Sequence, residues 1–95
     1  MLGAKLKELR EINGYVQRQI AAELEVDTAY ISKVENDEKP LSKNHLKKFS
    51  KLYSIDEKEL TQLWLADKII QVLDNEPCKK EALNLVIKEY QNDNK

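Results

Sequence analysis

Residues 17–36 read QRQIAAELEVDTAYISKVEN, and this stretch decides the fold. Its apolar positions recur at the three- and four-residue spacing that directs one face of a helix toward a core. Ala21 is a small residue at the point where two such helices would cross closely. Residues 25–27 give a turn of about three residues, the length expected of a helix-turn-helix unit. We therefore expect two short helices that share a core made by Ile20, Leu24, Val26, Ile31 and Val34.

Over about residues 6–60 the chain resembles the lambda-repressor and Cro-like helix-turn-helix regulators. Within the motif, the match includes the opening residue Gln17, the small crossing residue Ala21 and the buried Ile31, with the second helix ending in ISKVEN at 31–36. Two flanking stretches also match: Leu9-Arg10 with Gly14-Tyr15 before the motif, and LYSI at 52–55 after it. The resemblance implies an all-α bundle of roughly four to five helices that places the second motif helix, about residues 28–36, in the DNA major groove.

Two positions depart from the family pattern. Glu25 stands in the turn where the family usually has glycine, so either its backbone is left-handed or the turn is built differently. Val16 precedes the first motif helix where serine or threonine is usual, and its side chain cannot accept a backbone hydrogen bond. Both departures concern the stability of the motif rather than its reading surface.

Length and composition indicate one domain of 95 residues, large enough for a modest core. The single cysteine excludes an intramolecular disulfide and fits a reducing, cytoplasmic location. No apolar stretch reaches membrane-spanning length. Net charge is −1, but residues 1–53 carry ten Lys and Arg against eight Asp and Glu, and residues 54–95 carry six against nine. This distribution predicts a basic face, suited to DNA phosphates, on an acidic body.

Apolar spacing and turn residues predict six helices at about 3–13, 17–24, 28–36, 43–53, 57–73 and 78–91. Residues 1–55 form the expected DNA-binding domain, and residues 56–95 supply C-terminal helices that complete the core and form a dimer interface. The first helix is expected to turn Leu2, Leu6, Leu9 and Ile12 inward. Side chains expected to cap helices are Asp27, Ser42 and Asp56, the last in a capping box with Glu59.

The fifth predicted helix is more apolar than a single core-facing stripe requires. One stripe can pack on the first domain, and the surplus must meet either the sixth helix or a second subunit. Because regulators of this kind commonly bind two-fold DNA sites, we favour a homodimer. The predicted interface contains Trp64, Leu65, Ile69, Val72, Leu83, Val86 and Tyr90, with packing in the chain's own core as the alternative for Trp64.

The resemblance places four side chains of the second motif helix against base edges: Thr28, Ala29, Ser32 and Lys33. Hydroxyls can bond to several bases, small apolar groups can touch a thymine methyl, and lysine can reach guanine acceptors. The alternative is an ordinary solvated helix face. Predicted phosphate contacts come from the start of the first motif helix and from the region around the next helix start, and they are Gln17, Lys39, Ser42, Lys43 and Asn44. Each lysine could equally be a solvated surface charge.

For the other polar and reactive side chains we mainly expect structural roles. The family pattern pairs Arg10 with Glu35 in a salt bridge that fixes the second motif helix. The Tyr30 hydroxyl could reach a phosphate while the Tyr30 ring packs at the domain edge. His45 is expected to be a half-exposed helix residue, because no metal-ligand spacing surrounds it. Cys78, beside two lysines, suits a redox switch only if it is exposed, and we favour a passive, partly buried thiol.

No nucleophile and base stand at catalytic spacing, and no Gly-rich phosphate loop is present, so we expect no enzyme activity, cofactor, metal or small-molecule ligand. The sequence predicts a DNA-binding transcriptional regulator that binds a short two-fold operator in double-stranded DNA. It resembles phage-type repressors, antitoxin-like autoregulators and restriction-modification controller proteins, and we favour the last. The alternative is an interaction module that keeps the fold and binds another protein through the last two helices.

Overall fold

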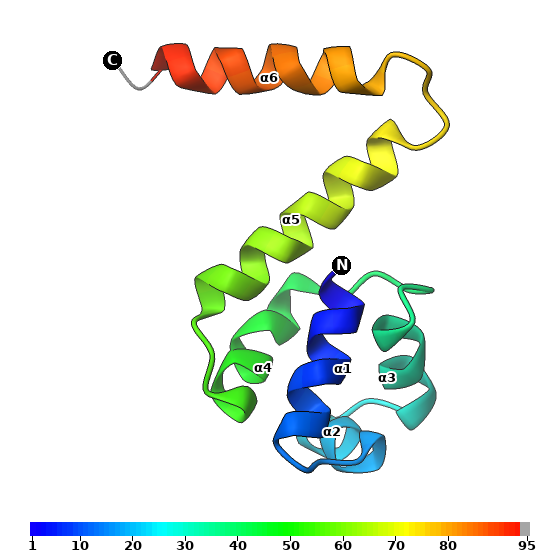
Figure 1. Ribbon diagram of the computed structural model, residues 1–95. Coiled ribbons are helices and arrows are strands. Elements are labelled where there is room, and N and C mark those ends of the chain that lie inside the picture. Colours follow the sequence, from blue (N-terminus) through cyan, green and yellow to red (C-terminus); the bar gives the residue numbers. More distant parts are fainter. Residues whose placement is uncertain (94–95) are drawn as a thin grey trace.

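The computed structural model describes residues 1–93, and every regular element in that range is helical (Figure 1). The expected all-α fold is therefore confirmed. The elements in chain order are α1 (Leu2–Ile12), α2 (Gln17–Leu24), α3 (Thr28–Glu35), the short 3-10 helix η1 (Lys43–His45), α4 (Leu46–Tyr53), α5 (Glu57–Leu73) and α6 (Lys79–Asp93).

Helices α1 to α5 surround one core, and α5 contributes to it through its first half (Figure 1). Leu60 on α5 is completely buried, and the indole Nε1 of Trp64 donates to the Leu41 carbonyl oxygen at 2.7 Å. Residues beyond 55 are thus needed to close the core over α4 and the preceding loop. The largest fully buried side chains are Phe49, Leu6, Ile20, Ile31, Leu46 and Leu60.

The last turn of α1 differs from the sequence expectation. Leu2 and Leu6 are buried as expected, but Ile12 is 71% exposed, so its predicted inward orientation was wrong. The chain turns back at Gly14, whose φ is 74°, and Tyr15 then packs against the core. Because this turn ends α1, Ile12 has no neighbouring helix to cover it.

The helix starts are capped less regularly than the sequence suggests. Asp27 and Ser42 precede α3 and η1, but neither side chain makes a capping hydrogen bond. Asp56 does cap α5, since its Oδ1 accepts from the Lys58 backbone nitrogen at 2.9 Å. At α2, Val16 offers no acceptor, and Gln19 Oε1 instead accepts the Val16 N–H at 2.8 Å.

The turn between α2 and α3 keeps the geometry that glycine would provide. Glu25 has φ 58° and ψ 45°, the left-handed conformation, and Val26 N donates to the Ala21 carbonyl at 2.9 Å. Of the two alternatives offered by the sequence, the backbone therefore adopts the left-handed one. A side chain in this conformation costs roughly 1–2 kcal/mol relative to glycine.

Gly3 permits a close approach that the sequence analysis did not identify. It is buried, and a Cβ at this position would collide with the Val34 carbonyl oxygen and lie 2.8 Å from the Glu35 carbonyl oxygen. The start of α1 thus rests directly on the last turn of α3. Any larger residue at position 3 would push these two helices apart.

The sixth helix stands away from the rest of the molecule. It turns back above α5 but diverges from it, and it packs closely against no other described helix (Figure 1). The radius of gyration of the Cα atoms is 15.6 Å, whereas a compact chain of this length would have about 12 Å. None of the helices in residues 1–93 combines the length and apolar character needed to cross a bilayer.

Candidate nucleic-acid interface

Helix α3 presents one face to the core and the other to solvent. Ile31 and Val34 are buried, and they anchor the helix between α1 and α2. The predicted base-reading side chains occupy its start and outer face: Thr28, Ala29 and Lys33 are exposed, and Ser32 is half-buried. The structure therefore brings the four together on one accessible helix, while their contact with bases remains a prediction.

A buried ion pair fixes the end of α3. Arg10 Nε donates to Glu35 Oε2 at 2.7 Å, and Arg10 Nη2 donates to Glu35 Oε1 at 3.1 Å. The carboxylate is only 3% exposed and the guanidinium 12%. This two-pronged hydrogen bond is strong and directional, and it raises the pKa of Arg10. The pairing implied by the family resemblance is thus present, and it joins α1 to the last residue of α3.

Two further hydrogen bonds extend this ion pair. Arg10 Nη1 donates to the Tyr15 carbonyl oxygen at 3.0 Å, and Gln17 Nε2 donates to Glu35 Oε1 at 3.0 Å. Gln17, predicted to hold a phosphate, is half-buried and keeps its second amide hydrogen free. Glu35 therefore orients the first side chain of α2 as well as the end of α3.

The predicted phosphate-binding residues after α3 are exposed, and Tyr30 contacts two of them, Lys39 and Ser42. The Tyr30 hydroxyl accepts from the Ser42 backbone N–H at 3.3 Å and lies 3.3 Å from His45 Nδ1. Lys39 Nζ lies 5.4 Å from the centre of the same ring. The Tyr30 hydroxyl is thus occupied within the domain, and His45 is half-buried through a contact that the sequence did not reveal.

Positive charge extends from this region along α4. Lys43 Nζ lies 5.8 Å from the centre of the Trp64 ring, so the aromatic face holds this lysine near the surface of the bundle. Asn44 beside it is exposed. The exposed lysines between α3 and the end of α4 are Lys39, Lys43, Lys47, Lys48 and Lys51.

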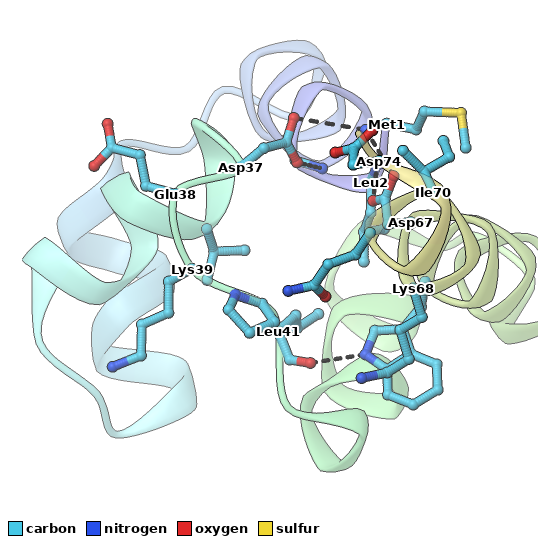
Figure 2. Close-up of a pocket in the computed structure, with 15 residues that line it drawn as sticks. Met1, Leu2, Asp37, Glu38, Lys39, Leu41, Asp67, Lys68, Ile70 and Asp74 are labelled. Atoms are coloured by element: carbon cyan, nitrogen blue, oxygen red, sulfur yellow. Dashed lines mark hydrogen bonds and ion pairs between the residues drawn. The ribbon is translucent and has the colours of Figure 1, made fainter. Parts of the chain in front are cut away.

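A cavity of about 400 Å³ lies between the start of α1, the loop after α3 and α5 (Figure 2). Asp67 on α5 accepts from the Leu2 backbone nitrogen at 2.9 Å, and Asp37 accepts from the Gly3 backbone nitrogen at 3.2 Å. Both carboxylates therefore cap α1. Sequence reasoning missed these caps, although Asp67 follows Leu60 and Trp64 at the spacing of the core-facing side of α5.

The predicted dimer residues fall into two groups. Trp64 is half-buried against the chain's own core, which is the alternative that the sequence left open for this residue. The others remain accessible: Leu83 is half-buried, and Leu65, Ile69, Val72, Val86 and Tyr90 are exposed.

The structure also bears on the single cysteine and on metal binding. Cys78 is exposed, so the expectation of a partly buried thiol was wrong. Its position between α5 and α6, in the connection that lies away from the core, explains this. Among the described residues, no group of three or more histidine, cysteine, aspartate or glutamate side chains could hold a metal ion.

Comparison with known proteins identifies the same part of the chain. A helix-turn-helix family model matches residues 6–60, which is more than half of the sequence and covers α2, α3 and the elements that support them. No curated protein and no solved structure gives a significant match.

Proposed function

The chain belongs to the helix-turn-helix family of lambda-repressor-like and Cro-like DNA-binding regulators, and on this basis we propose that it binds a short two-fold operator as a homodimer. In this proposal α3 of each subunit lies in the major groove. Thr28, Ala29, Ser32 and Lys33 read bases, and the residues around the start of α4 hold phosphates.

The observation that carries the proposal is the fixed position of α3. Glu35 at its end is tied to α1 and α2 by the Arg10 and Gln17 hydrogen bonds, and Ile31 holds its middle in the core. Side chains that read bases must be held in one orientation, because each bidentate contact distinguishes bases by only about 1–3 kcal/mol. The anchored side of α3 supplies that orientation and leaves Lys33 free on the opposite side.

The distribution of charge supports contacts to phosphates. Lys39 and Lys43 lie on either side of Ser42, and Tyr30 fixes the Ser42 backbone relative to α3. A groove-bound α3 and these lysines can thus act on the same stretch of DNA. The net charge of −1 does not oppose this, because residues 1–53 carry ten Lys and Arg against eight Asp and Glu, and the acidic excess lies in residues 54–95.

The exposed apolar side chains of α5 and α6 support dimerisation. Val72 is 78% exposed and Tyr90 is 66% exposed, an unfavourable state for a helix pair in water. Helix α6 and the end of α5 lie at the opposite end of the molecule from α2, so a dimer contact there leaves the helix-turn-helix motif open (Figure 1). Two subunits would then present two copies of α3 to the two halves of an operator.

Selection of bound sequences from random DNA, followed by salt titration, tests the proposal. The selected sites should show two half-sites about one helical turn apart. Lys33→Ala should cost roughly 1–3 kcal/mol on the selected site and much less on random DNA. Lys39→Ala should weaken all sequences alike and lower the salt slope by about one unit per contact.

A matched control is Lys58→Ala, which removes an exposed lysine from the start of α5, away from α3. This variant should leave both base preference and salt slope unchanged. If Lys39→Ala changes base preference while Lys33→Ala changes only the salt slope, the wrong surface has been assigned to the bases. If the wild-type chain binds no DNA at low salt, the fold serves a protein partner instead.

A further inference from the structure

Two unpartnered apolar stripes lie on the last two helices. The outer stripe of α5 consists of Leu65, Ile69 and Val72, which are four and three residues apart and face away from buried Leu60. On α6, apolar residues follow each other at intervals of three, one and three residues, which places them on one face. This α6 stripe consists of Leu83, Val86, Ile87 and Tyr90.

Within residues 1–93, no other part of the chain covers these stripes. Residues 74–78 form an open elbow in which Asp74 is extended (φ −55°, ψ 138°) and Asn75 has φ 69°. The elbow directs α6 away from α5 beyond their junction (Figure 1). Val86 remains 49% exposed and Ile69 remains 47% exposed as a result. Both stripes are therefore available to another molecule.

The exposed area has the size that a stable dimer needs. Six side chains of the two stripes are between 45% and 78% exposed: Leu65, Ile69, Val72, Val86, Ile87 and Tyr90. With roughly 100–150 Å² for each whole side chain, they present on the order of 400 Å² of apolar surface per chain. A standard interface buries about 800 Å² per partner, of which somewhat more than half is apolar.

A second copy of the chain is the occupant that uses both stripes at once. Under two-fold symmetry, α6 of each subunit can pack on α5 of the other, and the two contacts are identical. We infer that two chains exchange their last helices, so that the α6 stripe of each covers the outer α5 stripe of its partner. This inference rests on the proposed function only in that a two-fold operator requires a dimer.

Exchange also accounts for the open elbow. A helix that folded back on its own α5 would bury the two stripes within one chain and leave little apolar surface for association. A helix held away from its own α5 can instead reach the partner without any closed contact being broken first. Short connections that keep an element away from its own chain favour such exchange.

Crosslinking between two cysteine variants distinguishes exchange from other dimers. Both chains carry Cys78→Ser, which removes the one native thiol. The first chain also carries Leu65→Cys. The second carries Val86→Cys and a fused tag, so that the two chains differ in size. After mixing, a short bis-maleimide should join the two different chains in preference to two copies of either. A mixture of Lys7→Cys and Val86→Cys chains serves as control. It should give little crosslinked product, because Lys7 is an exposed residue of α1, a helix that takes no part in the proposed contact.

The possible results separate the inference from the proposed function. Crosslinks only between two Leu65→Cys chains would show that α5 packs on α5, and exchange would be overturned although the dimer remains. A wild-type chain that sediments as a monomer at tens of micromolar would overturn exchange and the dimeric operator complex together. Base reading by α3 would still be tested independently by the DNA selection described above.

A charge introduced into the α6 stripe provides a second measurement. Val86→Glu should weaken dimerisation at least tenfold in sedimentation, with no loss of the helical signal that α1 to α5 contribute in circular dichroism. Asn84→Glu is the matched control, because it adds the same charge at an exposed position outside the stripe. Equal dimerisation of the two variants would overturn the proposed contact.

Discussion

Removal of Arg10 should strongly destabilise the protein, because it would leave a buried carboxylate without its main partner. Glu35 is 3% exposed and accepts two hydrogen bonds from Arg10 and one from Gln17. In Arg10→Met only the Gln17 bond would remain. Breaking one side of a buried ion pair costs about 3–5 kcal/mol. A chain of 95 residues has a total stability of roughly 5–14 kcal/mol, so the loss is a large fraction of it.

Urea unfolding followed by circular dichroism measures this loss directly. The melting temperature should also fall by at least about 12 °C, at roughly 4–8 °C per kcal/mol for a domain of this size. The control is Arg18→Met, which alters the only other arginine, at an exposed position on α2, and should change stability by no more than about 0.5 kcal/mol.

The double variant Arg10→Met with Glu35→Leu identifies the cause of the loss. Because it removes the unpaired charge as well, it should recover most of the stability lost in Arg10→Met. If the double variant is as unstable as Arg10→Met, the loss comes from the packing of the arginine stem or from the freed Tyr15 carbonyl. If Arg10→Met unfolds no more readily than Arg18→Met, the ion pair does not anchor α3.

Two further predictions concern single positions. Glu25→Gly should stabilise the fold by about 0.5–1 kcal/mol, because relief of roughly 1–2 kcal/mol of left-handed strain exceeds the extra conformational entropy, about 0.5–1 kcal/mol, that glycine loses on folding. Glu23→Gly, the same change inside α2, should destabilise the fold by about 1 kcal/mol. Thermal unfolding of both variants tests this, and a lower stability for Glu25→Gly would refute it. Tyr53→Phe should be neutral or stabilising by up to about 1 kcal/mol at neutral pH, because the Tyr53 hydroxyl is buried and has no hydrogen-bond partner among the described residues. Burial raises the pKa of Tyr53, so the wild type should lose stability as pH rises above about 10, where the tyrosine of the unfolded chain ionises. Tyr53→Phe should lose less stability over the same pH range. If urea unfolding gives parallel curves of stability against pH for the two proteins, the prediction is wrong.

The sequence determined the helices and the motif, because these depend on local spacing and on residues that start or stop a helix. The bounds of α5, Glu57–Leu73, follow from the Asp56 cap and from an apolar run that ends at polar residues 74–76. The small Ala21 and the buried Ile31 identified the crossing of α2 and α3 in the same way. The family pattern added the pairing of Arg10 with Glu35.

Tertiary structure alone decided which apolar surfaces are covered. Periodicity assigns a residue to a face of a helix, but it does not show whether a neighbour lies opposite that face. Ile12 and Trp64 illustrate this: the first was expected to face inward but is exposed where α1 ends, and the second, for which the sequence left two positions open, packs against the core and donates to the Leu41 carbonyl.

Contacts between segments far apart in the chain were likewise decided only by the fold. Asp67 and Asp37 cap α1 from 65 and 34 residues away, and no local pattern indicates such a distance. Gly3 has a role only because α1 rests on the end of α3. The sequence showed that α5 has more apolar surface than one core needs, and the open elbow before α6 decided that this surface stays unpaired within a single chain.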